Sequence, residues 1–369
     1  MANKTARLGD LATYINGYAF KPADWGDTGL PIIRIQDLTG NSYQLNRYDS
    51  EYPERIEVND GDVLISWSAS LGVYVWQRGK ALLNQHIFKV VFDKLPVSKE
   101  YFVFAVEHKL AEMESKTHGA TMKHIVKKDF DGTTIPYPPI EKQAEIADHL
   151  RRITSLIDKQ TEQLLLLDQL VKSRFIELFG DPVRNSMGLP TEPMTTVCAI
   201  IDGDRGKNYP KQDEFSDTGY CLFLNAKNVT ATGFSFENRM FITKEKDNAL
   251  HNGKLERGDV VLTTRGTLGN LAFYDDSVPF ENVRINSGMV ILRMNKSVMT
   301  EVFFMEQFKL QLQSIKGKIA SGSAQPQLPI STMNKIRILL APMALQEQFA
   351  AFVEQTDKSK LCGKMEVAA

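Results

Sequence analysis

The fold is decided by a short pattern that the chain carries twice, as Gly61-Asp62-Val63-Leu64-Ile65 and as Gly258-Asp259-Val260-Val261-Leu262. In both places a hydroxyl residue, a leucine and a glycine follow at the same spacing, at Ser70-Leu71-Gly72 and Thr267-Leu268-Gly269. A Gly-Asp pair before an apolar run is typical of a tight turn that enters a strand, with the aspartate capping the turn. We therefore expect one structural unit to occur twice.

The repetition continues on both sides of this pattern. Asp27-Thr28-Gly29 returns as Asp217-Thr218-Gly219, and the segment Pro139–Gln143 returns as Pro342–Gln346. Solenoid repeats have periods of about 20–50 residues, and the offset between these copies is several times longer. The chain is therefore predicted to contain two copies of a whole domain, and such a chain usually binds a partner that has two similar sites.

Length and composition suit a two-domain globular protein. The 369 residues are enough for two domains of ordinary size, and the mixture of 43% apolar with 24% charged residues is typical of chains that bury a core. Lys and Arg number 44 against 45 Asp and Glu, which gives a net charge of −1. This balance disfavours a protein that coats nucleic acid through bulk charge, because phosphate contacts need local cations. It still allows a few placed side chains to read bases.

The sequence also indicates where the protein works. No apolar run approaches the about 18–20 residues that cross a bilayer, and residues 1–7 lack the apolar stretch of a secretory signal. Cys198, Cys221 and Cys362 are too few and too scattered for a disulfide framework or a Cys-x-x-Cys metal site. We expect reduced thiols, no metal site, no membrane contact and a cytoplasmic location.

The first part of each copy is predicted to be mixed α and β. Short runs rich in β-branched and aromatic residues indicate strands at residues 30–35, 62–66, 87–92, 220–224, 259–263 and 289–292. Apolar residues three to four positions apart indicate helices at Lys99–Ser115 and Thr300–Ile315. The expected fold class is α+β.

A long helix is predicted for Glu141–Phe179, which contains neither Gly nor Pro and is followed by the stop signal Gly180-Asp181-Pro182. At 1.5 Å per residue it is about 60 Å long. Ten positions from Ile146 to Leu178 follow alternating spacings of 4 and 3, and all except Gln160 and Arg174 are apolar, which indicates a coiled-coil seam. Its members are Ile146, Leu150, Ile153, Ile157, Leu164, Leu167 and Val171.

A second helix is predicted at the same place in the second copy. It follows Pro342, and its apolar residues are Leu345, Phe349 and Phe352. A helix with one apolar face needs a partner, so we expect the two helices to pair antiparallel in a pseudo-twofold molecule. The second helix is expected to be shorter, because only a short tail follows residues 357–361. The alternative for the first helix is an ordinary helical spacer.

These features together resemble the specificity subunit of type I restriction-modification enzymes. The resemblance covers nearly the whole chain, and it rests on the order and duplication of motifs that are weak when taken singly. They include the helix openings Pro-Pro-Ile-Glu-Lys-Gln-Ala-Glu-Ile (138–146) and Ala-Pro-Met-Ala-Leu-Gln-Glu-Gln-Phe (341–349), the two Gly-Asp stretches, and the helix end at residues 175–182. The short second helix departs from the usual pattern of the family.

The resemblance implies a non-catalytic DNA-recognition subunit. Two target-recognition domains would each read one half of a bipartite site on double-stranded DNA. The paired helices would set the gap and dock two methyltransferase (modification) subunits, and restriction subunits would join them. No cofactor is expected on this chain, because S-adenosylmethionine, ATP and Mg²⁺ would be bound by the partner subunits. The predicted segments are 1–138 (first domain), 139–182 (central spacer helix), 183–341 (second domain) and 342–369 (distal helix and tail).

Candidate DNA contacts are polar residues in loops near the ends of the predicted strands. Small hydroxyls suit close approach to DNA, arginine matches the O6/N7 edge of guanine, and glutamine matches the N6/N7 edge of adenine. A phosphate contact or an internal salt bridge is the alternative for Arg265, and a buried structural role is the alternative for His86. The candidates are Arg34, Gln36, Ser66, Ser68, Ser70, Gln85, His86, Lys123, Asn225, Lys227, Thr264, Arg265, Thr267, Arg284, Asn286, Ser323, Gln325 and Gln327.

Two functions of other classes remain open at this point. A Mg²⁺-dependent nuclease could use carboxylates such as Asp62 and Asp259, although their Gly-Asp-Val setting favours turn capping. A coiled-coil scaffold could bind peptides without reading DNA. The sequence contains no Walker A motif and no Asn-Pro-Pro-Tyr tetrad, and Gly203–Lys207 lacks the spacing of a phosphate-binding loop. We therefore predict no catalytic residue.

Overall fold

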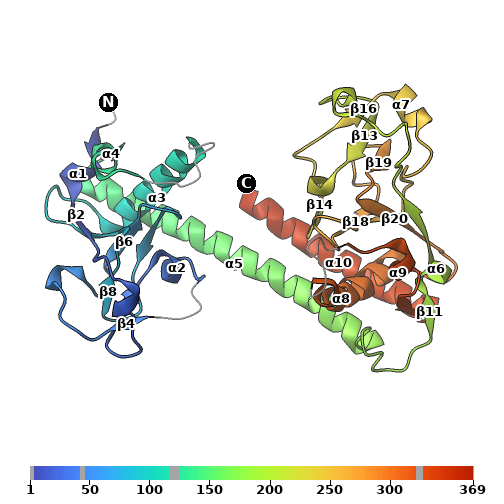
Figure 1. Ribbon diagram of the computed structural model, residues 1–369, viewed down its shortest axis with the longest axis horizontal. Coiled ribbons are helices and arrows are strands. Elements are labelled where there is room, and N and C mark those ends of the chain that lie inside the picture. The colour runs from blue at the N-terminus through green and yellow to red at the C-terminus, as the bar shows by residue number, and fades with distance from the viewer. Residues whose placement is uncertain (1–3, 42–45, 117–124, 321–326, 369) are drawn as a thin grey trace. The chain divides into compact units, whose positions relative to one another are not determined.

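The computed structural model describes residues 4–41, 46–116, 125–320 and 327–368. The chain divides into two compact units, Met1–Asp158 and Lys159–Ala369 (Figure 1), which we call unit 1 and unit 2. The division lies inside helix α5 (Ile140–Phe179). The first half of this helix therefore belongs to unit 1 and the second half to unit 2, whereas the sequence-based boundaries set 139–182 apart.

Unit 1 is built on two small sheets. The first is antiparallel, in the order β2 (Thr13–Asn16), β9 (Ile87–Val91), β6 (Val63–Ser66) and β7 (Gly72–Val75). The second has the order β4 (Arg47–Tyr48), β3 (Leu30–Ile33), β8 (Ala81–Leu83) and β5 (Glu57–Val58). Only the β3–β8 pair is parallel among these strands. β6 is buried at every position because it is an inner strand of its sheet.

Unit 2 repeats this plan. Its antiparallel sheet has the order β12 (Cys198–Asp202), β20 (Met289–Met294), β17 (Asp259–Thr263) and β18 (Leu271–Tyr274). Its second sheet has the order β16 (Phe241–Ile242), β13 (Cys221–Leu224) and β19 (Val283–Ile285), with β13 and β19 parallel. A hairpin joins β14 (Val229–Thr230) to β15 (Gly233–Phe234). The predicted internal repeat and α+β class are confirmed.

Helices and short edge ladders complete both units. The helices are α1 (Leu8–Leu11), α2 (Ile35–Leu38), α3 (Lys99–Lys116), α4 (Lys127–Gly132), α6 (Met194–Val197), α7 (Lys244–Ala249), α8 (Glu301–Ala320), α9 (Ile330–Met333) and α10 (Met343–Ala368). β1 (Thr5–Arg7) pairs with β10 (Thr134–Pro136), and β11 (Thr191–Pro193) pairs with β21 (Arg337–Leu339). Within the described part of the chain, no helix combines the length and apolarity that a membrane crossing requires.

The Gly-Asp turns that enter β6 and β17 have the same hydrogen bonds in both units. The carboxylates of Asp62 and Asp259 accept from the backbone N–H three residues earlier, at 2.9 and 2.7 Å. Gly61 and Gly258 have φ angles of +89° and +95°, which glycine adopts without the steric cost of a side chain. The capping role predicted for both aspartates is confirmed.

An aromatic cluster joins three helices of unit 2. Phe175 and Phe179 of α5, Phe303 of α8 and Phe349 of α10 are all fully buried. Ring centroids of contacting pairs are 4.6 to 5.6 Å apart. Burial of each such side chain contributes about 1.5–3 kcal/mol. The cluster therefore fixes the last turns of α5 and the first turns of α10 to the core of unit 2.

Within unit 2, α5 and α10 run antiparallel. Phe349 near the start of α10 contacts Phe175 and Phe179 near the end of α5. Lys360, farther along α10, forms an ion pair of 2.7 Å with Asp168, which lies earlier in α5. The predicted antiparallel pairing is confirmed for this part of the helices. α10 has 26 residues against 40 in α5, and it includes most of the segment that the sequence analysis treats as a tail.

A buried glutamine ties each long helix to the globular part before it. The Gln143 side-chain oxygen accepts from the N–H of Ser98, and the Gln346 oxygen accepts from the N–H of Thr300, both at 2.9 Å. Each amide nitrogen also donates to the carbonyl five residues earlier, at 2.9 and 2.8 Å. Ser98 is the residue before α3, and Thr300 is the residue before α8. The same junction is thus built twice.

Replacing this glutamine should destabilise the unit that contains it. Gln346→Leu leaves the Thr300 N–H without its acceptor, and a buried unpaired donor costs about 1–3 kcal/mol. Calorimetry of the full chain should show a lower Tm for unit 2, by about 2–4 °C per kcal/mol for a domain of this size. Gln355→Leu, at an exposed position of α10, is the matched control. Equal losses in the two variants would contradict the anchoring role.

Candidate nucleic-acid interface

Two loops that the sequence predicts as DNA contacts meet in unit 2. One follows β17 and the other precedes α9. The backbone of Arg265 forms an antiparallel bridge with that of Gln327, and the Leu328 N–H donates to the Thr264 carbonyl at 3.1 Å. The side chains of Arg265 and Gln327 are both exposed. The structure therefore places these two candidates together at one edge of unit 2.

A third segment, between β19 and β20, completes this edge. The N–H groups of Thr264 and Arg265 donate to the Gly288 carbonyl at 2.8 and 3.3 Å. The side-chain oxygen of Asn286 accepts from the Gly288 N–H at 2.9 Å. Asn286 is half-buried, and its oxygen is used within its own loop. The backbone around Arg265 is consequently held on both sides.

A cavity of about 300 Å³ opens at the same edge. Val290 and Leu328, each 2% exposed, give it buried apolar surface. Arg265 lines it together with Asp202, the last residue of β12, and Arg205, which comes from the loop after β12. Ligand pockets in proteins start at about this volume. The site thus combines two guanidinium groups with a small apolar surface.

Sequence analysis missed Asp202 and Arg205. A guanidinium nitrogen of Arg205 donates to the Asp202 carboxylate at 3.0 Å and to the Ser287 carbonyl at 3.2 Å. The Arg205 side chain is 48% exposed. A loop of glycine and charged residues directly after the apolar run 198–201 is the signal that could have identified it. The same criterion selects the loop after β17.

Arg284 has an internal role, which corrects its prediction as a DNA contact. It is 5% exposed and forms an ion pair of 2.5 Å with Asp247. Burial by itself would raise the pKa of Asp247, but hydrogen bonds from Lys254 and Arg284 outweigh burial and lower this pKa. Arg284 also donates to backbone carbonyls of residues 247, 250 and 252. Its charge is thus fully used inside unit 2.

Three hydroxyl residues are also internal, and their prediction as contacts is corrected in the same way. Ser66, Ser68 and Thr264 are 0%, 8% and 5% exposed. The Ser66 hydroxyl donates to the Ser70 carbonyl at 2.6 Å, and the Thr264 hydroxyl donates to the Gly288 carbonyl at 3.0 Å. The Ser66 and Thr264 hydroxyls therefore shape the loops, and other side chains of these loops face solvent.

Asn225 and Lys227 lie after β13. The Asn225 side-chain oxygen accepts from the Lys227 N–H at 2.9 Å, as a cap of the short 3₁₀ helix Ala226–Asn228. Asn225 is half-buried, whereas Lys227 is exposed. Thr267, in the loop after β17, is exposed as well. Lys227 and Thr267 therefore stay available for contact, and Asn225 is mainly a capping residue.

The equivalent residues of unit 1 follow β3. The backbone N–H of Arg34 donates to the Asp37 carboxylate at 2.8 Å, which repeats the bond between Asn225 and Asn228 in unit 2. The Arg34 guanidinium lies 3.4 Å from the same carboxylate and 5.6 Å from the centre of the Trp25 ring. Arg34 is therefore engaged within unit 1. Gln36 is exposed.

The remaining described candidates of unit 1 lie in the loop between β6 and β7 and in the turn between β8 and β9. Ser70 is exposed, and Gln85 is half-buried with its N–H donating to the Tyr18 carbonyl at 2.9 Å. His86 has a φ of +72° and its ring centre is 4.9 Å from that of Trp67. Its Nδ1 is buried and has no hydrogen-bond partner among the described residues. His86 thus combines a packed ring with an unusual backbone conformation.

Three candidates lie outside the described residues and stay predictions. They are Lys123, Ser323 and Gln325. Among the described candidates, six have exposed side chains, either in loops or, for Gln36 and Lys227, in a short helix. These are Gln36, Ser70, Lys227, Arg265, Thr267 and Gln327.

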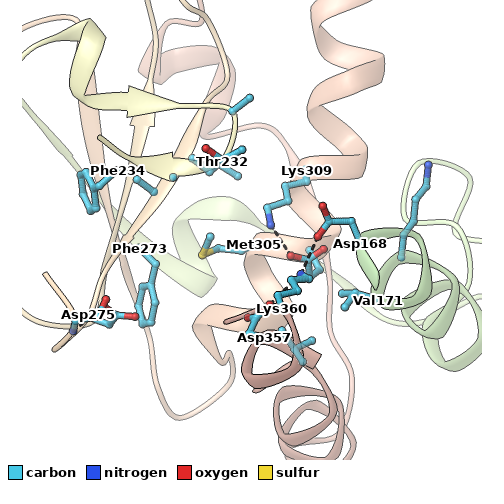
Figure 2. Close-up of a pocket in the computed structure, with 18 of the residues that line it drawn as sticks. Asp168, Val171, Thr232, Phe234, Phe273, Asp275, Met305, Lys309, Asp357 and Lys360 are labelled. Carbon is cyan, nitrogen blue, oxygen red and sulfur yellow. Dashed lines mark hydrogen bonds and ion pairs between the residues drawn. The ribbon is translucent and has the colours of Figure 1, made fainter. Parts of the chain in front are cut away.

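A larger cavity of about 820 Å³ lies between the helices and the strands of unit 2 (Figure 2). Lys360 forms ion pairs with Asp168 at 2.7 Å and Asp357 at 2.9 Å across the helix side of this cavity. Acidic and basic side chains both line it, so it is no cationic surface for DNA. The labelled lining residues are Asp168, Val171, Thr232, Phe234, Phe273, Asp275, Met305, Lys309, Asp357 and Lys360.

The predicted helix seam is partly covered and partly exposed. Its buried or half-buried members are Leu164, Leu167, Val171, Leu345, Phe349 and Phe352. Its members with 37–52% exposure are Ile146, Leu150, Ile153 and Ile157. Helix pairing is confirmed where α10 lies against α5 in unit 2. For the earlier part of α5 it stays a prediction.

The family described as the type I restriction modification DNA specificity domain matches the chain twice, at residues 2–167 and 195–363. The specificity subunit of the type I restriction enzyme EcoBI from Escherichia coli is 28% identical over 315 residues, which cover 78% of this chain and 64% of that protein. The MjaVIII specificity subunit from Methanocaldococcus jannaschii is 25% identical and covers 96% of this chain and 86% of its own length. This chain thus spans just under two thirds of the first relative.

Solved structures show the same fold. The S subunit of a type I restriction-modification system from M. genitalium matches with a TM-score of 0.57 and 15% identity, over 99% of this chain and 92% of that chain. A structure of type I restriction-modification complex assembly matches with a TM-score of 0.55, 16% identity and the same coverage. The two family matches coincide with the two structural repeats. The chain therefore belongs to the type I restriction-modification DNA specificity family and carries its domain twice.

Proposed function

We propose that this chain is the non-catalytic DNA-specificity subunit of a type I restriction-modification system. Units 1 and 2 would each read one half of a bipartite site on double-stranded DNA. The observation that carries the proposal is the duplication of a whole recognition domain, down to the capped Gly-Asp turns and the buried glutamines that lead into α5 and α10. Two similar domains match a target that has two halves.

In this proposal α5 sets the gap between the half-sites. Its 40 residues form one continuous helix, and at 1.5 Å per residue such a helix is about 60 Å long. Half-sites on one face of B-DNA lie about 34 Å apart per helical turn, which is within the reach of this helix. A flexible linker would leave the spacing undefined, because its end-to-end distance fluctuates.

The same helix offers a surface for protein partners. Leu156, Leu165, Leu166 and Leu170 of α5 are 64%, 59%, 55% and 49% exposed. Exposed apolar side chains that gather on one element mark interaction sites. We propose that two modification subunits dock on α5 and bring S-adenosylmethionine, that restriction subunits with ATP and Mg²⁺ join them, and that the complex works in the cytoplasm.

The nuclease alternative loses its candidate ligands. The Asp62 carboxylate caps its own turn. Asp259 is 1% exposed, and both of its oxygens accept from the Arg293 guanidinium at 2.8 Å. Carboxylates engaged in this way serve the fold. A scaffold that does not read DNA would not require exposed arginine and glutamine side chains in neighbouring loops, as Arg265 and Gln327 are at the edge of unit 2.

Lengthening α5 should change the recognised gap. Four helix-forming residues inserted after Gln160 add about 6 Å to the helix. Mapping of methylated adenines in cells that express the chain with its modification subunit should then show a gap longer by about one or two base pairs, or no methylation at all. The same insertion beside Asp276, whose side chain is fully exposed in a loop, is the control. An unchanged gap would contradict the role of α5 in spacing.

Exchanging the first domain should alter only one half of the target. Residues 1–137 end before Gln143, so a replacement domain that offers an N–H in the place of Ser98 keeps the junction with α5. Methylation mapping should report a new half-site beside an unchanged one at the same gap. A change in both halves, or in neither, would disprove independent reading by the two units.

Charging the exposed face of α5 should weaken docking of the modification subunit. The double variant Leu166→Glu with Leu170→Glu replaces apolar contact by charge, and loss of a buried leucine contact costs about 2–5 kcal/mol. Co-purification and titration calorimetry should show at least tenfold weaker binding. The control, Gln163→Glu with Gln169→Glu, adds the same charge at exposed positions of the same helix. Equal weakening in both variants would indicate a charge effect without a docking role for the leucines.

A further inference from the structure

The cavity at the loop edge of unit 2 allows a more specific inference, which rests on the proposed function. Two guanidinium groups reach this cavity from segments far apart in the sequence, Arg205 after β12 and Arg265 after β17. Their surroundings differ. Arg205 is tied to a carboxylate, whereas Arg265 has no side-chain partner among the described residues. This difference suggests different roles on DNA.

The loop that carries Arg205 is fixed before any ligand binds. The Asp204 carboxylate accepts from the Gly206 N–H at 2.8 Å and from the His251 N–H at 2.7 Å. Asp202 accepts from the Gly203 N–H at 2.9 Å and from Arg205 at 3.0 Å. With one of its nitrogens already occupied, Arg205 has fewer donors left for a base edge. A single phosphate oxygen requires only one or two of them.

Arg265 has the complementary properties. Its backbone is bonded to Gly288 and bridged to Gln327, so its position is defined, while its side chain is exposed. A free guanidinium can donate two parallel hydrogen bonds to the O6 and N7 atoms of guanine. The buried apolar surface of Val290 and Leu328 beside it keeps competing polar groups away. Arg265 therefore suits base reading.

Unit 1 has no arginine at the position that corresponds to Arg205. Gly17 and Gly203 correspond, because each has its α-carbon directly against the backbone carbonyl of an asparagine at the end of the parallel strand pair, Asn84 or Asn286. A side chain at either glycine would collide with that carbonyl. Two residues after Gly17, the residue in the place of Arg205 is an alanine.

Arg265 has no counterpart in unit 1 either. The residue before it, Thr264, donates from its N–H to the Gly288 carbonyl, and Trp67 donates in the same way to the His86 carbonyl. Thr264 and Trp67 also accept equivalent bonds from Leu328 and residue 125. The residue after Trp67 is a buried serine. The equivalent loop edges of the two units thus carry different side chains.

We propose that this cavity is the base-reading site of unit 2, where Arg265 contacts a guanine of its half-site and Arg205, positioned by Asp202, contacts a neighbouring phosphate. Unit 1 reads its half-site without either contact. The two half-sites are consequently contacted by different chemistry. One half contains a guanine on which affinity depends through Arg265.

The test uses the full chain in complex with its modification subunits. The target is first mapped by sequencing methylated adenines, and duplexes with each single base pair changed are then measured by fluorescence anisotropy at several salt concentrations. Arg265→Ala should weaken the cognate duplex about 5- to 150-fold and abolish discrimination at one G·C pair only. Arg265→Lys keeps the charge but loses the bidentate fork, so it should lose the same discrimination.

Arg205→Ala should behave differently. It should weaken the binding of all duplexes by the same factor. The negative slope of log affinity against log salt should become shallower by about 0.9, because one phosphate contact is lost. Asp202→Asn should shift the slope in the same direction. Arg184→Ala, whose side chain is 85% exposed outside the cavity, is the matched control and should leave discrimination and slope unchanged.

The possible failures are distinguishable. If the complex with the unsubstituted chain binds no bipartite site selectively, the proposed function itself fails. If it does so, but Arg265→Ala and Arg265→Lys keep full discrimination at every G·C pair, only the guanine contact is overturned. If Arg205→Ala changes discrimination at one base pair with an unchanged salt slope, Arg205 reads a base and the assignment to phosphate is overturned. Circular dichroism of each variant separates these outcomes from unfolding.

Discussion

The junction between each globular part and the helix that follows it is the constraint on which the rest of the structure depends. A buried amide, from Gln143 or Gln346, binds the N–H that precedes α3 or α8 and also a carbonyl of the incoming chain. Both side chains are at most 1% exposed, where an unpaired amide would be costly. The amide therefore fixes the direction in which each helix leaves. The proposed recognition by spacing requires a fixed direction, because a unit that rotated freely at the junction would leave the spacing undefined whatever the helix length.

Local partners decide the role of each charged residue more than the net charge of −1 does. Arg284 and Arg265 are about twenty residues apart in unit 2, yet the first is paired with Asp247 and the second is exposed. Burial alone would favour the neutral form of Asp247, and the two cations that donate to it reverse this preference. The buried Arg284 also holds the backbone carbonyls of residues 247, 250 and 252. A near-neutral chain can thus keep an individual cation such as Arg265 exposed.

Sequence alone could predict the repeat, the main strands and both long helices, because turn motifs and apolar periodicity are local. The fates of single polar residues could not. Ser66 is a strand residue whose hydroxyl is consumed by a carbonyl four positions later, and Arg284 meets a carboxylate 37 positions earlier. The cavity joins segments near residues 202, 265 and 327. Only the folded sheet order, β12-β20-β17-β18, places these segments at one edge.

The exposure of α5 also supports the proposed docking of partner subunits. Leu165 and Leu166 are more than half exposed in a helix whose later turns bury Phe175 and Phe179 completely. The same helix is therefore a core element at one end and an open apolar surface farther back. Covering each leucine would contribute about 1.5–3 kcal/mol, and α10 lies against only part of the helix in unit 2. A partner that covers these leucines would be held on α5. In the proposed function, the partner then carries out the chemistry, and this chain encodes the spacing of the target.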